Sequence, residues 1–232
     1  MSMIESVRKQ LTPIHPEGYI FVVGFAIVTL VLGSFSGSLF WIGAIATAWC
    51  AYFFRDPVRH TPLDVNLVIA PADGVVCSIG YFAPPPELGL SAEPIPRVSI
   101  FMSAFDCHVN RAPVAGRVTK IAYRPGAFIN ADLNKASENN ERNGLVIESA
   151  GSRFGVVQIA GFIARRIVCF VRQGEVIGAG DRFGLIRFGS RVDVYLPAVA
   201  RTLVTTGSRA IAGETVLAEL RTTVPRRNFK SG

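Results

Sequence analysis

The serine at position 190, which follows a glycine, is the first residue in this sequence that suggests chemistry. A serine hydroxyl is a weak nucleophile until a base or strain activates it, and a preceding glycine allows backbone conformations that other residues avoid. The Gly189-Ser190 peptide bond is therefore a possible target of its own serine. A Gly-Ser pair is not specific by itself, because the chain repeats it at 33-34, 37-38, 151-152 and 207-208. Whether the pair at 189-190 is a functional site therefore depends on the surrounding stretch, residues 184–193.

Two other residues suit acid–base chemistry. His108 is the one histidine after residue 66, where strand patterns dominate, so it is the candidate general base by elimination. A structural histidine bonded to the backbone is the alternative. Asp73 stands in the sequence Ala-Pro-Ala-Asp-Gly, and Asp-Gly after an apolar run is also a turn signal. Both readings of Asp73, chemistry and turn, stay open on these residues alone.

The cysteines and the charge exclude several classes of site. The four cysteines form no C-x-x-C pair and no framework spacing, which argues against a metal site and against a disulfide scaffold. The net charge of +7 is not concentrated in a basic run with interleaved aromatics, so we expect no nucleic-acid partner. An anionic membrane surface fits better, because each basic residue near such a bilayer gains about 1 kcal/mol.

The N-terminal quarter has the composition of a membrane segment. Residues 18–54 contain no Asp, Glu, Lys, Arg or His, and two apolar runs, 19–32 and 39–54, flank a Gly/Ser-rich break. Basic residues lie before the first run and after the second, which predicts a helical hairpin with both ends on the cytoplasmic side of the cell membrane. A cleaved signal peptide is the alternative, although a second apolar run follows immediately.

The rest of the chain predicts a mainly β domain. Short β-branched runs are separated by Gly, Pro, Asn and Asp, which is typical of a compact β sandwich or barrel. These runs are 67–69, 74–76, 98–101, 116–118, 145–147, 155–159 and 167–171. The phrases at 70–76 and 112–118 look like two versions of one strand-turn-strand unit, so we expect a duplicated fold.

We therefore divide the chain into a lead-in (1–17), a membrane-associated hairpin (18–56) and a catalytic β domain (57–232). The proline-rich stretch 81–96 reads as a connecting loop that is either exposed or wrapped over the sheet. The most polar stretch, residues 130–143, reads as a long loop of the kind that often borders a site. The basic tail at 226–230 is a plausible membrane contact.

Several motifs in fixed order resemble the short bacterial form of phosphatidylserine decarboxylase. They are Phe53-Phe54-Arg55-Asp56-Pro57, Pro71-Ala72-Asp73-Gly74, Asp106-Cys107-His108, Gln158-Ile159-Ala160-Gly161 with Ala164-Arg165-Arg166-Ile167, and Phe183-Gly184 followed by Arg187-Phe188-Gly189-Ser190-Arg191-Val192-Asp193. Each motif is weak alone, but their order and spacing are specific. The resemblance extends over roughly residues 15 to 220.

The resemblance implies a proenzyme that cuts itself between Gly189 and Ser190, into a large chain (1–189) and a small chain (190–232) that stay together. Ser190 would become a pyruvoyl group, a covalent cofactor that needs no metal. The group would form a Schiff base with the amine of phosphatidylserine and release phosphatidylethanolamine and CO₂.

The family also assigns roles to other residues. An Asp-His-Ser set drives self-cleavage, and Asp73 and Ser190 match two of its members. Longer relatives have two histidines three residues apart, where this chain has His108 and then Arg111. Either His108 serves both processing and decarboxylation, or another group does one of them. Arg165 and Arg166 could bind the substrate phosphate or carboxylate, or could simply lie on a strand surface.

A membrane-tethered carrier or adaptor domain without catalysis is the second hypothesis. Paired strand-turn-strand phrases also occur in biotinyl- and lipoyl-carrying sandwiches, which need a lysine at a hairpin tip. The lysines here are Lys9, Lys120, Lys135 and Lys230, and none stands in a Met-Lys-Met type of turn.

Overall fold

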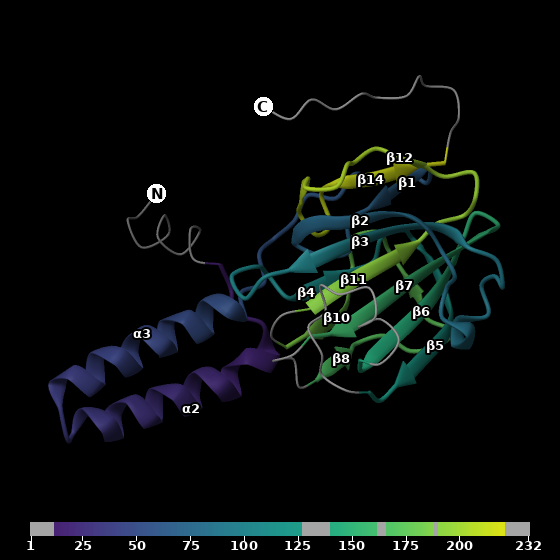
Figure 1. Cartoon of the computed structure of the whole chain (residues 1–232). Coiled ribbons are helices and arrows are strands. Elements are labelled where there is room, and N and C mark those ends of the chain that lie inside the picture. The colour runs from purple at the N-terminus through teal and green to yellow at the C-terminus, as the bar shows by residue number, and fades with distance from the viewer. Residues whose placement is uncertain (1–11, 127–139, 162–165, 188–189, 221–232) are drawn as a thin grey trace. The chain divides into compact units, whose positions relative to one another are not determined.

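The computed structural model describes residues 12–126, 140–161, 166–187 and 190–220 of the chain (Figure 1). The chain forms two compact units, Met1–Val58 and Arg59–Gly232. Among the described residues, the first unit is helical and the second, which we call the β unit, is built from strands. The prediction of a mainly β protein with apolar N-terminal helices is confirmed.

The first unit is a hairpin of two helices, α2 (Pro16–Gly33) and α3 (Gly37–Phe53). A proline suits the first turn of α2, because the backbone N–H that it lacks has no helical partner there. The segments that enter and leave the hairpin bond to each other: His15 N–H donates to the Phe54 carbonyl at 2.8 Å, and Asp56 N–H donates to Pro13. The two ends of the hairpin therefore lie side by side.

The two helices pack through small and hydroxyl side chains. The Thr29 and Thr47 hydroxyls lie 3.1 Å apart, and a side chain at Gly43 would collide with Thr29. Most large apolar side chains of both helices are exposed. By length and composition α2 is able to cross a bilayer, and α3, at 17 residues, is slightly shorter. A signal sequence has the same properties, so the membrane hairpin stays a prediction.

The strands of the β unit form three antiparallel sheets. The largest has the order β13-β2-β3-β11-β7-β6-β5-β9, and the two small ones are β1-β14-β12 and β4-β10-β8. The strands span Leu67–Ile69 (β1), Gly74–Phe82 (β2), Ile95–Met102 (β3), Val109–Arg111 (β4), Gly116–Arg124 (β5), Arg142–Ser149 (β6), Ser152–Ala160 (β7), Ile167–Cys169 (β8), Val176–Ile177 (β9), Arg182–Ile186 (β10), Ser190–Tyr195 (β11), Arg201–Thr202 (β12), Arg209–Ala210 (β13) and Val216–Glu219 (β14).

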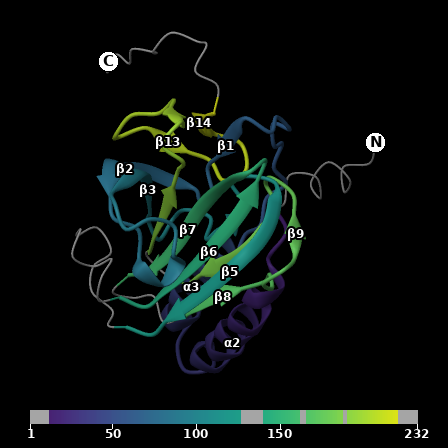
Figure 2. The same ribbon diagram turned by 90° about the vertical axis from the view of Figure 1, so that its right-hand side faces the viewer.

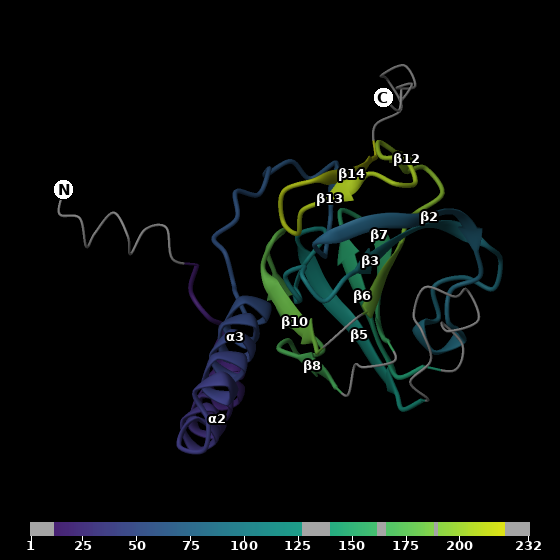
Figure 3. The same ribbon diagram turned by 60° about the vertical axis from the view of Figure 1, so that its left-hand side comes forward.

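The large sheet curves, and β5, β6 and β7 run side by side along one part of it (Figures 2 and 3). Its inner face shares one apolar core with the two small sheets, to which β3 contributes Ile100, β10 contributes Phe183 and β14 contributes Leu217. Its other face buries a smaller cluster that includes Tyr195. Leu88, from the 3-10 helix η1 (Pro86–Leu88), packs within that cluster. The proline-rich segment thus packs over the sheet, which is one of the two arrangements expected for it.

The β unit consists of two similar halves, as the repeated phrases predict. Backbone bonds in one half recur in the other: Val76 N–H donates to Ser208 as Val118 N–H does to Glu175. β2 pairs with β3 and β13 as β5 pairs with β6 and β9, and each pair has a bulge at the same place. The small sheets match as well, with β1-β14-β12 corresponding to β4-β10-β8.

The halves are nested, because β4 to β10 lie in sequence between β3 and β11. In the second half β6 and β7 are joined by a tight turn at Ala150-Gly151, both with positive φ. Ser152 begins β7 as Ser190 begins β11, and both serines follow a glycine in the sequence. The Gly-Ser pair at 151-152 is therefore the internal counterpart of the pair at 189-190.

The structure corrects the prediction of one loop. Residues 130–143 were expected to form a single polar loop, but Arg142 and Asn143 belong to β6, and residues 140–143 are all buried. Their polar side chains are satisfied within the fold; for example, Asn140 Nδ2 donates to the Ala160 carbonyl at 2.7 Å. Residues 130–139 of the expected loop, the lead-in up to residue 11 and the basic tail lie outside the described residues.

Candidate functional site

Ser190 is the first residue of β11, a strand in the middle of the large sheet. It pairs with Met102 of β3 on one side and with Ala160 of β7 on the other. The residue is fully buried, and its Oγ has no hydrogen-bond partner among the residues that the structure describes. Buried hydroxyls are nearly always bonded, so this one is a candidate for a reactive group.

His108 is buried beside the strand that leads to Ser190. Its carbonyl accepts a hydrogen bond of 3.3 Å from Ile186 N–H, at the end of β10. Its Nδ1 lies 2.9 Å from the Asp106 carbonyl oxygen. A carbonyl cannot donate, so in a neutral imidazole Nδ1 carries the proton and Nε2 is the basic nitrogen. This tautomer suits a general base.

The turn before His108 is fixed by Asp106, which is 2% exposed. One carboxylate oxygen accepts hydrogen bonds of 2.8 Å from both the N–H and the hydroxyl of Ser103. The other is paired with Arg209. These bonds hold the segment that joins β3 to β4, and with it the carbonyl to which the His108 ring is bonded.

Asp73 lies at the start of β2, on the other side of β3 from Ser190. Its carboxylate accepts from Arg59 at 2.7 Å and from the Ala212 N–H at 2.8 Å, rather than from His108. Gly74 has to be a glycine, because a Cβ there would come 2.1 Å from the Phe101 carbonyl oxygen. The structure thus places Asp73 at the same end of the sheet as Ser190, but in an ion pair.

A row of three hydrogen-bonded, buried amides lies two residue pairs along the sheet from Ser190. Asn143 donates to Gln158 at 2.9 Å, and Gln158 donates to Asn110 at 2.8 Å. Gln158 stands opposite Val192 in β11, and Asn110 is two residues beyond His108 in β4. These three amides therefore link the large sheet, which carries Ser190, to β4, the strand that directly follows His108.

This amide chain leaves no room at Gly184, where a Cβ would come 2.7 Å from Gln158 Nε2. The sequence motifs include Gln158 and Gly184 but do not indicate that they meet. The available signal is an amide inside an apolar strand, Val156-Val157-Gln158-Ile159-Ala160.

The other predicted site residues are only partly described. Arg166 is exposed, and its carbonyl accepts from Arg187 N–H at 3.2 Å, three residues before Ser190. Its charge lies close enough to Tyr123 to oppose the rise in pKa that burial and the Glu141 hydrogen bond cause there. Gly189 and Arg165 lie outside the described residues. Among those that are described, no cluster of His, Cys, Asp and Glu is arranged to hold a metal ion.

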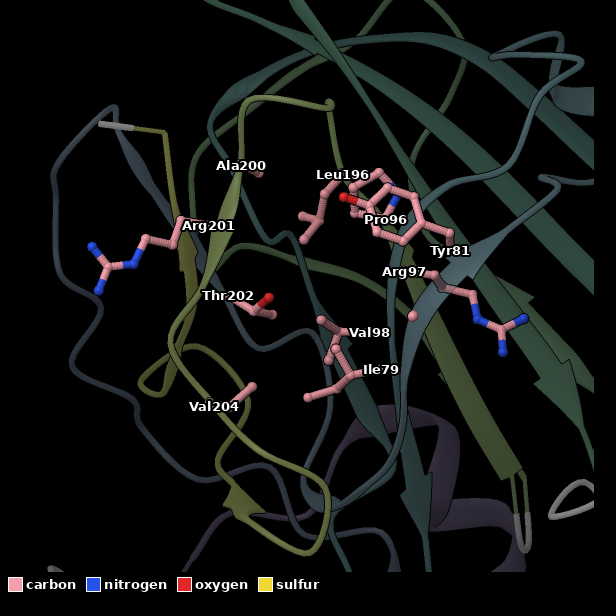
Figure 4. A pocket seen from close by; sticks show the side chains of 11 residues that line it. Ile79, Tyr81, Pro96, Arg97, Val98, Leu196, Ala200, Arg201, Thr202 and Val204 are labelled. Carbon is pink, nitrogen blue, oxygen red and sulfur yellow. The ribbon is translucent and has the colours of Figure 1, made fainter. Parts of the chain in front are cut away.

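A cavity of about 470 Å³ lies far from these residues, at the opposite end of β11. Apolar side chains such as Val98, Leu196 and Val204 line it, while the side chains of Arg97 and Arg201 point away from it (Figure 4). β11 rises about 3.4 Å per residue, so some 20 Å separate this cavity from Ser190. The cavity is therefore not part of the candidate site.

Comparison with known proteins shows the family of this chain. Residues 46–218 match the family model described as phosphatidylserine decarboxylase. A phosphatidylserine decarboxylase proenzyme of Beijerinckia indica subsp. indica is 64% identical over 232 residues, covering all of both chains. The matched segment contains the large sheet, Ser190 and the two small sheets except for the last residue of β14. The chain belongs to the phosphatidylserine decarboxylase family.

Proposed function

We propose that this protein decarboxylates phosphatidylserine to phosphatidylethanolamine, and that it is made as a proenzyme which cuts itself between Gly189 and Ser190. The observation that carries the proposal is the buried Ser190 hydroxyl, which has no hydrogen-bond partner among the described residues, at the start of the central strand. Family membership and the 64% identical proenzyme support the same assignment.

Self-cleavage needs only this chain and water. The Ser190 Oγ adds to the Gly189 carbonyl carbon, and the Gly189–Ser190 C–N bond breaks to leave an ester and a free amine. A base then removes the Ser190 α-proton, and the bond between Cβ and Oγ of residue 190 breaks, which releases residues 1–189 with a carboxylate end. The dehydroalanine at position 190 takes up water and loses ammonia, which leaves a pyruvoyl group.

The residues around position 190 fit such a group, since Ser190 is buried and no described residue forms a hydrogen bond with its hydroxyl. Once formed, the pyruvoyl group supplies an electron sink for the electrons that remain when CO₂ leaves the amino acid. His108 Nε2 is the group that we assign to hold and move protons, because the Asp106 carbonyl orients its ring. The buried surroundings keep bulk water away from the reacting atoms.

The remaining roles follow from the chemistry of the substrate. Phosphatidylserine carries a phosphate and a carboxylate, and we assign Arg166, with Arg165, to bind one of these groups. The apolar helices α2 and α3 anchor the protein in the cell membrane, with the β unit on the cytoplasmic side, where Arg55 and Arg59 follow the hairpin. A carrier function is not favoured, because Lys120 lies inside β5 and not at a turn.

Mass spectrometry of the purified protein tests the proposal. We expect two chains, the smaller beginning at position 190 with a blocked N-terminus, and release of CO₂ from phosphatidylserine labelled in the serine carboxyl. Ser190→Ala is expected to stay intact at 25.0 kDa and to be inactive. An intact wild-type chain, or a Ser190→Ala chain that still splits after residue 189, contradicts the proposal.

A further inference from the structure

A buried carboxylate, that of Glu141, lies in the same row of the large sheet as Ser190. The row crosses β11, β7 and β6, which are neighbours in the sheet (Figure 1). Ser190 pairs with Ala160 of β7, and Ala160 N–H donates to the Glu141 carbonyl at 3.0 Å. Glu141 directly precedes β6 and is 5% exposed. At about 4.8 Å per strand, the backbones of Ser190 and Glu141 are about 10 Å apart, with a small alanine between them.

The side chains of this row point to the small sheet β4-β10-β8. Gln158, two residues before Ala160, bonds to a side chain of β4, and side chains two apart in a strand share a face. Residues paired across strands also share a face, which places Ser190 on the same side. Glu141 Oε1 accepts from Ile167 N–H, in β8, at 3.3 Å. The carboxylate and the serine therefore face the same way, on either side of the alanine.

The charge of Glu141 has no basic partner among the residues that the structure describes. Its Oε1 accepts from the Tyr123 hydroxyl at 3.1 Å and from the Ile167 N–H, and both of these donors are neutral. Oε2 can therefore accept from a further donor. Burial of a carboxylate is costly unless a cation compensates the charge, because burial removes the water that stabilises it. The surroundings of Glu141 thus favour a cationic ligand.

The fold itself does not require a carboxylate at this position. In the other half of the β unit, Ile95 begins β3 as Arg142 begins β6, and the two residues occupy matching places in their strand pairs. Pro94 is therefore the counterpart of Glu141. A proline has no charge, yet the strands of that half pair in the same way. Of the two matching positions, the one with the carboxylate is the one at the Ser190 end.

An arginine lies beside this carboxylate. Arg166, which is exposed, directly precedes Ile167, whose N–H is bonded to Glu141. Burial raises the pKa of Tyr123, the bond to Glu141 adds to the rise and the Arg166 charge opposes it, so both charges lie close to this hydroxyl. The headgroup of phosphatidylserine carries an ammonium, a carboxylate and a phosphate. A carboxylate next to an arginine matches this mixture of charges.

We propose that the Glu141 carboxylate binds the ammonium group of the serine headgroup and so selects substrates that carry an amine. The inference rests on the proposed function, in which this amine has to reach residue 190. An ammonium bound at Oε2 forms a charge-assisted hydrogen bond and compensates the buried charge. A headgroup that lacks the amine does neither. Glu141 is thus a specificity-determining residue of the candidate site.

Binding of lipids that cannot react tests the inference on the processed full-length protein. Calorimetry compares two short-chain phospholipids. One has an N,N-dimethylethanolamine headgroup, whose protonated tertiary amine cannot condense with a carbonyl, and the other has an ethanol headgroup without an amine. We expect the wild type to bind the first at least about tenfold more tightly, as for one charge-assisted hydrogen bond. Glu141→Gln should bind both alike, because glutamine keeps an acceptor oxygen but has no charge.

Kinetics give a second readout. With short-chain phosphatidylserine as the substrate, Glu141→Gln should raise KM at least about tenfold and change kcat less, as expected when an interaction that binds the substrate is lost. Glu141→Asp, which keeps the charge, should recover part of the preference for the cationic lipid. A variant in which kcat falls while KM and the preference stay as in the wild type contradicts a binding role.

Two control variants separate the charge from other effects. Glu148 lies near the opposite end of β6 and is exposed, so Glu148→Gln should leave KM and the preference unchanged. Tyr123→Phe removes one hydrogen bond to Oε1 but no charge, and it should keep the preference. If Tyr123→Phe loses the preference as completely as Glu141→Gln, the carboxylate only holds its neighbours, and the inference is overturned.

The outcomes distinguish the inference from the proposed function. A Glu141→Gln variant that still prefers the cationic lipid, or a wild type that shows no preference, overturns the inference alone. A Glu141→Gln chain that does not cut itself assigns the carboxylate to processing and also overturns the inference. A wild-type protein that prefers the cationic lipid but releases no CO₂ from phosphatidylserine overturns the proposed function instead.

Discussion

The Ile186 N–H donates a 3.3 Å hydrogen bond to the carbonyl of His108, so the candidate base is tied to the strand that leads to the cleavage site. β10 ends at Ile186, and Ser190 begins the next strand, so a short segment joins the two sites. The backbone of the candidate base is thus bonded to the last residue of the strand that precedes Ser190 in the sequence.

His108→Asn is the sharpest test of this arrangement. The asparagine amide can keep the hydrogen bond to the Asp106 carbonyl, but it has no basic nitrogen. We expect self-cleavage, or decarboxylation by the chains that do form, to fall at least about a hundredfold. Gel analysis of processing and CO₂ release measure the two steps separately. If both steps proceed at the wild-type rate in a folded variant, His108 has only a structural role.

The Arg59–Asp73 ion pair gives a second prediction. Both side chains are mostly buried, so removing either partner leaves an uncompensated charge, which costs about 3 kcal/mol or more. We expect Asp73→Asn and Arg59→Met to destabilise the β unit by similar amounts, to slow self-cleavage alike, and to combine non-additively in the double variant. Thermal unfolding and processing rates measure this. Loss of cleavage in Asp73→Asn alone assigns Asp73 a direct role at Ser190.

The two chains produced by cleavage should stay together without a covalent link. In the uncut chain, β11 pairs along all six residues with β3 and with β7, and β13 and β14 pair with β2 and β1. The small chain supplies the middle strand of the core, so separating it exposes the core on both sides. We expect co-elution in gel filtration until denaturant unfolds the whole β unit. Dissociation in native buffer contradicts this.

The buried amide chain should matter for stability. Gln158→Leu leaves the amides of Asn143 and Asn110 without this partner, at about 1–3 kcal/mol for each buried group. Leu196 is the counterpart of Gln158 in the other half, and Leu196→Met, which is nearly isosteric, should cost under about 1.5 kcal/mol. Denaturant midpoints compare the two. Equal midpoints for both variants contradict a structural role for the amides.

Alkaline unfolding should depend on Tyr195. Burial raises the pKa of Tyr195 and the Asp193 charge adds to it, while Arg97 and Arg191 oppose the rise only in part. The folded state therefore keeps the phenol neutral after the unfolded chain has lost the proton, so stability is complete below about pH 10, the ordinary tyrosine pKa, and falls above it. Tyr195→Phe should flatten this decline in unfolding experiments between pH 9 and 11. An unchanged slope contradicts the prediction.

Local patterns predicted the features that depend on neighbouring residues. The β-branched run at 155–159 lies within β7, the repeated phrases mark the two halves, and the motif around Ser190 identified the family. The amide chain was missed because its members lie as far apart in sequence as Asn110 and Gln158. Residues 140–143 were read as loop because they are polar, yet pairing with β7 and burial outweigh composition there.

The role that the family assigns to Asp73 shows a different limit. A sequence motif marks the residue but not its partner, and here the carboxylate is paired with Arg59, the first residue of the β unit. Which groups face each other is decided by long-range strand pairing, and a single sequence carries that information only weakly. Gly189 and Arg165 stay predictions from the sequence.

The nested halves explain how the proposed cut, at the bond that precedes the central strand β11, could leave the strand pairing intact. In the second half, the Gly-Ser pair at 151-152 closes a hairpin between adjacent strands, where a cut would free both strand ends at once. In the first half that hairpin does not exist, because Ser190 is reached from β10 while its neighbour β3 ends at Met102. The proposed cut at position 190 would therefore separate β11 from β10, which lies in a different sheet, and would break no pairing between neighbouring strands of the large sheet.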